Sequence, residues 1–221
     1  MVVAGLDSSW RYYFIRTYIT PSYNNRCQST DHTWGVAILA RATTISPPIK
    51  YVLGTETWGE DRVLACLDFT VGFNMRICTT HLTQTSQAVA AQQAVSAANS
   101  INSWIAAGKA VIMGGDFNLD VRECGNGNIL NAFRPWYYGS FGAGASLCYS
   151  GGTGSMYEVD HYRAGGDGTY DEKTIVTSVG SRKFDYTFGN RQNMLGDYGG
   201  DATTSYVSDH DPLRGAITAH D

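Results

Sequence analysis

The sequence has few charged residues, no long apolar run and no complete signal peptide, and each shortage narrows what the protein can be. Charged residues make up 16% of the 221 residues and the net charge is −4, so a surface that coats nucleic acid through general basic charge is not indicated. No apolar run approaches the roughly 20 residues that span a bilayer, so no transmembrane segment is expected. The N-terminal stretch MVVAGLDSSW has neither a basic region nor a long apolar region, unlike a signal peptide.

Hydrophobic residues are plentiful at 43%, and the chain contains 14 Tyr and 5 Trp. This is enough for one substantial core, and we expect a single domain over residues 1–221. Few lysines, many Tyr, Ser, Thr and Gly residues and five cysteines are typical of secreted proteins. On composition alone, we therefore expect secretion.

Short apolar stretches between turns predict many strands and one long helix. Strands are expected at 12–19, 33–40, 109–113, 183–189 and 212–219. The Ala-rich segment 86–108 has apolar residues at helical spacing, and Gly108 can close the helix. Residues 121–170, rich in Gly, Ser, Tyr and Asn, are predicted to form a long loop region with short elements.

The segment 62–82 predicts a β-hairpin, whose register follows from pairing residues symmetrically about Gly72. One face of the hairpin is then apolar. The other face places Asp68 opposite Arg76, so that opposite charges lie across from each other. His81 falls on the apolar face, just past the end of the second strand.

Five cysteines leave at least one without a partner in the chain. Cys66 and Cys78 face each other in the predicted hairpin, either as a disulfide or as two buried thiols. Cys124 and Cys148 lie in one loop-rich region and are candidates for a second disulfide. Cys27 is then left over, as a free thiol or as the partner of a cysteine in a preceding segment.

Four short polar clusters stand at the ends of predicted strands. They are TTHL (79–82), GGDFNLD (114–120), KFDYTF (183–188) and SDHDPL (208–213). Taken singly, each is most simply a turn or a structural histidine. Taken together, they place two histidines, several aspartates and an asparagine on loops that can meet at one edge of a layered fold.

These residue types suit the metal-assisted hydrolysis of a phosphodiester. The reaction needs a base for the attacking water, a cation near the phosphoryl and leaving oxygens, and donors that hold the phosphate. Histidine, with an ordinary pKa near 6.5, suits the base, and a carboxylate behind it fixes its tautomer. Carboxylate and amide oxygens suit Mg²⁺.

In this order, THL, GDFN, a hydrophobic-Asp-Tyr strand and SDH-x-P resemble the endonuclease/exonuclease/phosphatase superfamily, which includes deoxyribonuclease I, the bacterial sphingomyelinases and the inositol-polyphosphate 5-phosphatases. The similarity runs from about Thr33 to the C-terminus. It implies an α+β fold of the DNase I-like kind, a four-layer α/β/β/α sandwich with two sheets face to face and helices outside. It also implies one active site at an edge of that sandwich.

The resemblance also implies roles for the motif residues. His81 would bind the scissile phosphate or assist the leaving group, and Asn118 would hold the attacking water or a phosphate oxygen. Asp116 would orient or deprotonate that water. His210 would contact phosphate or act as the base, so the base is assigned to the pair Asp116 and His210. Asp185 would orient His210 through a hydrogen bond.

Asp209 would belong to a metal site for Mg²⁺, with Mn²⁺ or Ca²⁺ as alternatives. Family members also begin with a strand ending in Asn and a second strand ending in Gln-Glu, whose Glu is the principal metal ligand. The sequence shows neither, and Asp7 is the nearest stand-in; the simpler interpretation is that the chain starts late and lacks its first strand. Glu60 or Asp61 is a candidate for the acid that supports His81.

The resemblance therefore implies a divalent-metal-dependent phosphodiester hydrolase, foremost a secreted, monomeric DNase-like endonuclease acting on DNA. Alternatives within the fold are a phosphoinositide phosphatase and a sphingomyelinase-type phosphodiesterase acting on a phospholipid headgroup. The aromatic stretch FRPWYYGSF (133–141) is a weak candidate for membrane contact, and a packed loop is the simpler interpretation. The missing Glu suggests a third hypothesis, a catalytically impaired, truncated homologue.

Overall fold

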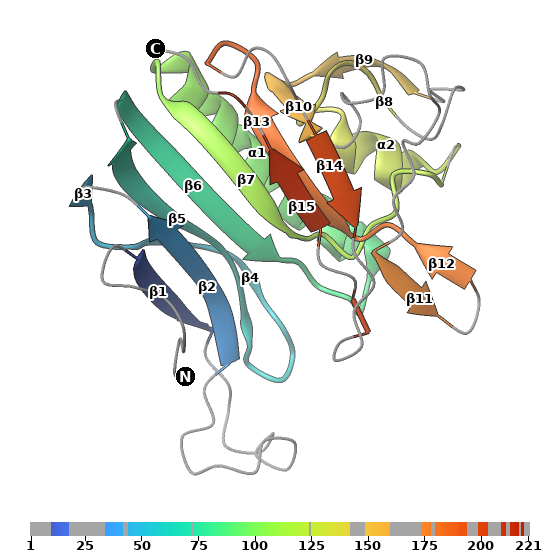
Figure 1. Cartoon of the computed structure of the whole chain (residues 1–221). Helices are drawn as coiled ribbons and strands as arrows, with labels where there is room; N and C mark the ends of the chain where they lie inside the picture. Colours follow the sequence, from blue (N-terminus) through green and yellow to red (C-terminus); the bar gives the residue numbers. More distant parts are fainter. Residues whose placement is uncertain are drawn as a thin grey trace.

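In a computed structural model of the chain, the described residues are 10–17, 34–41, 44–71, 73–123, 125–141, 149–159, 174–177, 180–193, 199–202, 209–210, 213–216 and 218. Within these ranges, a long helix lies against one side of a mixed β-sheet and two short hairpins lie on the other side (Figure 1). No helix in these ranges is long and apolar enough to cross a membrane.

The central sheet has seven strands. They are β3 (Thr44–Ile45), β4 (Ile49–Thr55), β5 (Asp61–Val71), β6 (Phe73–His81), β7 (Ala110–Asp116), β10 (Met156–Glu158) and β13 (Asp185–Asn190). Their order is β10, β13, β7, β6, β5, and both β3 and β4 pair with the outer edge of β5. Strands β6 and β7 run parallel and the other neighbours antiparallel. A parallel pair needs a crossover connection, which here is a helix.

That helix, α1 (Gln87–Ala106), covers one face of the sheet (Figure 1). At its start, the Ser86 side chain accepts a hydrogen bond from the Val89 backbone N–H. At its end, Gly108 has a φ of 85°, a conformation that glycine adopts without strain. The helix predicted over 86–108 is confirmed.

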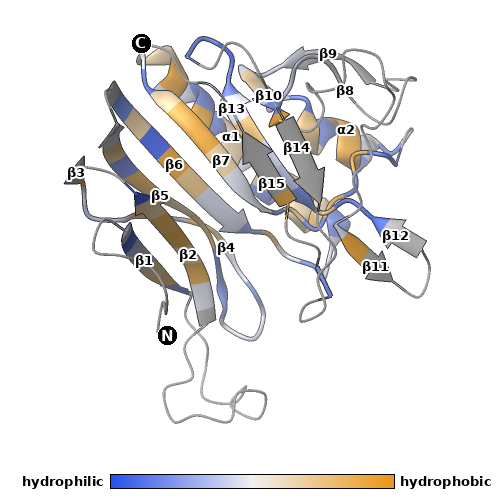
Figure 2. Cartoon of the chain, in the orientation of Figure 1, coloured by the Kyte–Doolittle hydropathy of each residue, from blue (hydrophilic) through white to orange (hydrophobic). Residues whose placement is uncertain are grey.

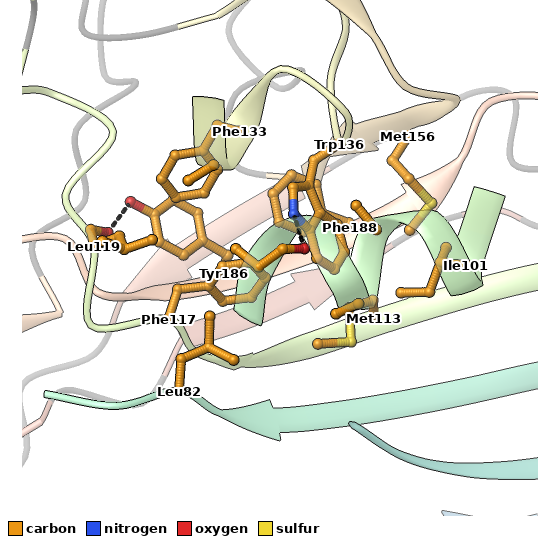
Figure 3. Packing of buried hydrophobic residues seen from close by; sticks show 14 of the residues in the cluster. Leu82, Ile101, Met113, Phe117, Leu119, Phe133, Trp136, Met156, Tyr186 and Phe188 are labelled. Atoms are coloured by element: carbon orange, nitrogen blue, oxygen red, sulfur yellow. Dashed lines mark hydrogen bonds between the residues drawn. The ribbon is translucent and has the colours of Figure 1, made fainter. Parts of the chain in front are cut away.

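The main core lies between the sheet, α1 and the short helix α2 (Gly127–Phe133). Its aromatic centre consists of Phe117, Phe133, Trp136, Tyr186 and Phe188 (Figure 3). The ring centroid of Phe117 lies 5.0 Å from that of Trp136 and 5.2 Å from that of Tyr186. Figure 2 shows hydrophobic residues along most of β7, the strand that leads to Phe117. The end of β7 is therefore tied to the core.

Two antiparallel hairpins lie on the side of the sheet away from α1 (Figure 1). They are β1 (Trp10–Thr17) with β2 (Trp34–Arg41), and β14 (Gly199–Ala202) with β15 (Leu213–Ala216). Ile15 of β1 packs against Val63 and Ala65 of β5. The described residues thus form one helix layer and two β layers, which confirms the predicted α+β, DNase I-like class.

The β5–β6 hairpin has the predicted register, with Asp68 opposite Arg76 and Cys66 opposite Cys78. Of the two hypotheses for these cysteines, the structure contains the disulfide. The prediction of a single apolar face is wrong, because Leu64, Cys66 and Cys78 lie in the main core. Both faces of the sheet are covered, and a strand covered on both faces buries residues of both alternating sets.

Residues 121–170 contain more regular structure than predicted. Besides α2 and β10, they contain β8 (Tyr138–Phe141) paired with β9 (Tyr149–Thr153). In the stretch 133–141, Phe133, Trp136 and Tyr137 are buried, so the packed interpretation is the one that the structure supports. The predicted roles of Asp7, Cys27, Cys124 and Cys148 fall outside the described residues.

Candidate active site

Three of the predicted site residues lie side by side at one edge of the central sheet. His81 ends β6 and Asp116 ends β7, and the parallel register pairs these two residues directly. Asp185 begins the antiparallel strand β13 and pairs with Asp116 from the other side. Side chains of directly paired residues lie on the same face of a sheet, so the three form one row.

His210 reaches this row from a separate segment, where it forms a β-bridge with Ile175. Its Nδ1 lies 2.7 Å from Asp185 Oδ2, and its Nε2 lies 3.8 Å from Asp116 Oδ2. His81 Nε2 lies 3.5 Å from the same oxygen of Asp116. Asp116 is therefore placed between two imidazoles, and Asp185 binds the far nitrogen of one of them.

The contact with Asp185 determines the tautomer of neutral His210. An ionised carboxylate only accepts hydrogen bonds, so Nδ1 carries the hydrogen and Nε2 keeps its lone pair. That lone pair lies on the side of Asp116. An imidazole with a carboxylate behind Nδ1 and with Nε2 on the side of the site has the arrangement of a general base.

Burial and neighbouring charge perturb the ionisation of the row. Burial, followed by the negative charge of Asp185, raises the pKa of Asp116 to about 7. Burial would lower the pKa of His210, but the hydrogen bond to Asp185 and its charge raise it above the ordinary 6.5. Burial and the positive charge of Arg62 lower the pKa of His81. Such combined shifts are typical of functional sites.

The loop after β7 is held by Asn118. Its backbone N–H donates to Asp116 Oδ1 at 2.8 Å, and its side-chain Nδ2 donates to the Leu82 carbonyl oxygen at 2.9 Å. Its φ of 51° is a conformation that asparagine tolerates better than most residues. Asn118 thus joins the loops that follow His81 and Asp116. Its predicted contact with water or phosphate remains a prediction.

Gly115 allows β6 and β7 to approach each other closely just before the site. Its φ is 149°, and a Cβ atom there would lie 2.3 Å from the carbonyl oxygen of Thr80. Any side chain would push apart the two strands that carry His81 and Asp116. The second glycine of GGDFN is therefore required by the backbone.

Asp120, the second acid of GGDFNLD, lies outside the row. It is buried, and Arg122 donates to its two carboxylate oxygens at 2.8 and 2.6 Å. The same carboxylate accepts the backbone N–H of Lys183 at 3.4 Å. Asp120 therefore fastens the loop after β7 to the segment that begins β13.

Among the described residues, Asp116, Asp185 and His210 form a group whose ligand atoms lie within 4.8 Å of one another. The raised pKa of Asp116 reflects a carboxyl group in a partly buried place beside a second carboxylate, and a cation would relieve that repulsion. Two carboxylates fit a hard cation such as Mg²⁺, Ca²⁺ or Mn²⁺. Asp209 is exposed and is not a member of this group, so its role as a ligand remains a prediction.

The two acids predicted to support His81 have different surroundings. Asp61 accepts a hydrogen bond from Lys50 Nζ at 2.9 Å, which engages it in an ion pair. Glu60 Oε2 lies 3.5 Å from the Arg62 guanidinium. Its negative charge raises the pKa of His81 and so opposes the lowering by burial and Arg62. Of the pair, Glu60 is the one that influences His81.

Arg62 is a residue beside the site that the sequence analysis missed. It is 3% exposed, and its Nε donates to Glu56 Oε1 at 2.9 Å. Its charge lowers the pKa of both His81 and Asp116. An arginine at the start of a strand is ordinarily a surface residue, and nothing in the local pattern shows that this one points inward.

No family model matches the sequence, and no curated protein matches it significantly. Solved structures match over most of the chain. The human Nocturnin catalytic domain with bound sulfate anion has a TM-score of 0.64 at 16% identity, over 95% of this chain and 73% of that one. An endonuclease/exonuclease/phosphatase from Bacteroides vulgatus has a TM-score of 0.64 at 13% identity, over 96% and 77%.

A third match is TDP2 of D. rerio complexed with single strand DNA product, with a TM-score of 0.59 at 14% identity, over 93% of this chain and 75% of that one. At these identities the likeness is one of fold. It agrees with the layered sheets of this chain. The chain therefore has the DNase I-like fold of the endonuclease/exonuclease/phosphatase superfamily.

Proposed function

We propose that the protein is a divalent-metal-dependent phosphodiester hydrolase and that DNA is its substrate. The observation that carries the proposal is the 2.7 Å contact between His210 Nδ1 and Asp185 Oδ2, with His210 Nε2 on the side of Asp116, 3.8 Å from its Oδ2. The fold supports it too, since the TDP2 match is described with a DNA product and the Nocturnin match with a sulfate, a tetrahedral anion like phosphate.

In this proposal, His210 Nε2 takes a proton from the attacking water and Asp185 stabilises the imidazolium that results. Asp116 accepts a hydrogen bond from the same water and orients it. The His81 side chain, 46% exposed, donates to a phosphate oxygen or to the leaving group. A positioned base of this kind contributes roughly 10²- to 10⁴-fold to a rate. Asn118 holds the water or a phosphate oxygen from the neighbouring loop.

Asp116 and Asp185 would hold the cation, and Asp209, next to His210 in the chain, would add a further carboxylate. A bound divalent cation neutralises charge on the phosphoryl and leaving oxygens. Without a cation, a pKa of about 7 leaves much of the Asp116 carboxyl group protonated at neutral pH. The ionised form of Asp116 that orients water is therefore linked to metal binding.

The proposal is tested by the cleavage of supercoiled plasmid DNA with Mg²⁺, and with EDTA as the metal-free control. We expect nicking with Mg²⁺, no nicking with EDTA, and loss of nicking in His210→Ala and Asp185→Asn. Asp61→Asn is the matched control, because Asp61 is paired with Lys50 and lies outside the row. Full metal-dependent cleavage by His210→Ala would contradict the proposal.

The same assay separates the alternative substrates when RNA, a phosphoinositide and sphingomyelin are added to the screen. Burial of Phe133, Trp136 and Tyr137 leaves Tyr138, 45% exposed, as the large aromatic side chain of this stretch at the surface, which gives little support to a lipid substrate. Absence of turnover on every substrate, together with absent Mg²⁺ binding in calorimetry, would instead support a catalytically impaired homologue.

We further propose that the protein is secreted and acts as a monomer. The Cys66–Cys78 disulfide supports an oxidising compartment, because disulfides persist mainly outside the reducing cytosol. Mass determination in solution and detection of the protein in culture medium test the two statements.

A further inference from the structure

Thr174 is a buried residue whose hydroxyl lies at the start of β13. Its exposure is 0%, and its Oγ1 accepts hydrogen bonds from the backbone N–H groups of both Phe184 and Asp185, each at 3.0 Å. The backbone N–H of Thr174 in turn donates to the Arg182 carbonyl oxygen at 2.9 Å. One side-chain oxygen thus holds the backbone of the residue that binds His210.

The next residue, Ile175, holds the other member of the pair. It begins β11 (Ile175–Thr177), which pairs with β12 (Gly180–Arg182), and it forms the β-bridge with His210. Two consecutive residues therefore contact the two partners, Thr174 through a side-chain oxygen and Ile175 through the backbone. Asp185 and His210 are 25 residues apart in the chain. A short common support reduces their relative motion.

We propose that Thr174 is a positioning residue that aligns Asp185 with His210. The inference rests on the proposed function for its effect on catalysis, but the alignment itself does not depend on the substrate. Catalytic geometry is sensitive at this scale, since a displacement of about 1 Å can reduce a rate roughly 10²-fold. Loss of the Thr174 hydroxyl would also remove the acceptor of two part-buried N–H groups, which destabilises the start of β13.

Two substitutions separate the hydroxyl from the shape of the side chain. Thr174→Val keeps the shape and removes the acceptor, and Thr174→Ser keeps the acceptor and removes a methyl group. Thr174→Cys offers a weaker acceptor of similar size and serves if the valine variant does not fold. Ser46→Ala is the matched control, because it removes another hydroxyl that accepts a backbone N–H, that of Asp68 at 3.1 Å, outside the row.

The first measurement is the proton NMR signal of His210 Nδ1–H in protein labelled with ¹⁵N-histidine, assigned with His210→Ala. We expect a downfield, slowly exchanging signal in the unsubstituted protein and in the Thr174→Ser and Ser46→Ala variants. In Thr174→Val, or in Thr174→Cys to a smaller extent, the signal should broaden or move upfield. An unchanged signal in a folded Val or Cys variant would overturn the inference.

The second measurement is the steady-state kinetics of DNA cleavage with Mg²⁺. We expect kcat to fall about 10- to 10²-fold in Thr174→Val with little change in KM, and to recover in Thr174→Ser. A rise in KM with unchanged kcat in Thr174→Val, or no recovery of kcat in Thr174→Ser, would contradict a positioning role. If the unsubstituted protein cleaves no phosphodiester, the proposed function fails, while the NMR comparison still decides the inference on Thr174.

Discussion

Asp116 and Asp185 pair directly across β7 and β13, so two carboxyl groups lie together at the edge of the sheet. Burial and the charge of Asp185 raise the pKa of Asp116 to about 7, while Asp185 itself engages His210. The two acids have the same chemistry but different partners. Asp185 binds the imidazole of His210, whereas Asp116 is the carboxyl group whose pKa burial raises.

The stability of the metal-free protein should depend on pH through Asp116. A pKa raised from 3.8 to about 7 means that the protonated form stabilises the folded state. This contribution is fully present below about pH 4 and is lost as the pH rises through 7. We expect Asp116→Asn to become more stable relative to the unsubstituted protein as the pH rises from 4 to 8. Urea titrations with EDTA measure the free energy of unfolding of both proteins.

Asp61→Asn is the control for this pH dependence. The hydrogen bond from Lys50 lowers the pKa of Asp61, so its stabilising contribution is present above about pH 4 and lost as the pH falls. Between pH 4 and 8, the stability curve of Asp61→Asn should therefore run parallel to that of the unsubstituted protein, and the two curves should converge only below about pH 4. Parallel pH curves for Asp116→Asn and the unsubstituted protein would show that Asp116 is not perturbed.

Mg²⁺ should stabilise the folded protein if Asp116 and Asp185 hold it. A ligand at 100 times its Kd stabilises by about 2.7 kcal/mol when it binds only the folded state. We expect the melting temperature to rise with Mg²⁺ concentration, and the rise to shrink in Asp116→Asn and Asp185→Asn but not in Asp61→Asn. Equal shifts in all four proteins would place the cation elsewhere.

Gly115→Ala should destabilise the protein more than Gly108→Ala. Both residues have positive φ, which costs an alanine about 1–2 kcal/mol. At Gly108 a Cβ meets nothing within 4 Å, whereas at Gly115 it would lie 2.3 Å from the Thr80 carbonyl oxygen. Chemical denaturation of the two variants measures the difference. A smaller loss for Gly115→Ala would mean that β6 and β7 can separate without cost.

Substitutions of Lys183 and Glu158, which form a buried ion pair, should have non-additive effects on the free energy of unfolding. Lys183 Nζ lies 3.0 Å from Glu158 Oε1, both residues are fully buried, and the Tyr137 hydroxyl donates to the same glutamate. Removing one member of a buried pair costs about 3–5 kcal/mol, because the other charge stays buried. In a double-mutant cycle, Lys183→Met with Glu158→Gln should cost less than the sum of the single changes. Additive effects would contradict this.

Much of the fold follows from local patterns that the sequence displays. Helical spacing and Gly108 place α1, and symmetry about Gly72 gives the register that pairs Asp68 with Arg76. Each is a short-range pattern, since period and turn residues act over a few neighbours. The burial of both faces of the β5–β6 hairpin could not be predicted from such local patterns, because it depends on layers contributed by distant segments.

The candidate site, too, was predicted from the sequence only in part. The sequence placed the polar clusters near strand ends, but β7 continues to Asp116, beyond the predicted strand 109–113, and β13 begins at Asp185 rather than at residue 183. His81, Asp116 and Asp185 form one row because the strands pair directly at these residues. The sequence has no pattern that predicts the burial of the Arg62 side chain or the hydrogen bond from the Asp185 backbone N–H to Thr174. Both depend on side-chain direction and on contacts between segments far apart in the chain.

By itself, the sequence determined the residue types of the site, the strand ends that carry them and the order in which they occur. The resemblance already implied that Asp185 binds His210, whereas only the tertiary structure placed Asp116 between the two imidazoles. It also decided that the pKa of Asp116 rises to about 7. The reason is physical: ionisation and hydrogen bonding depend on distance and burial, which exist only after the sheets have packed.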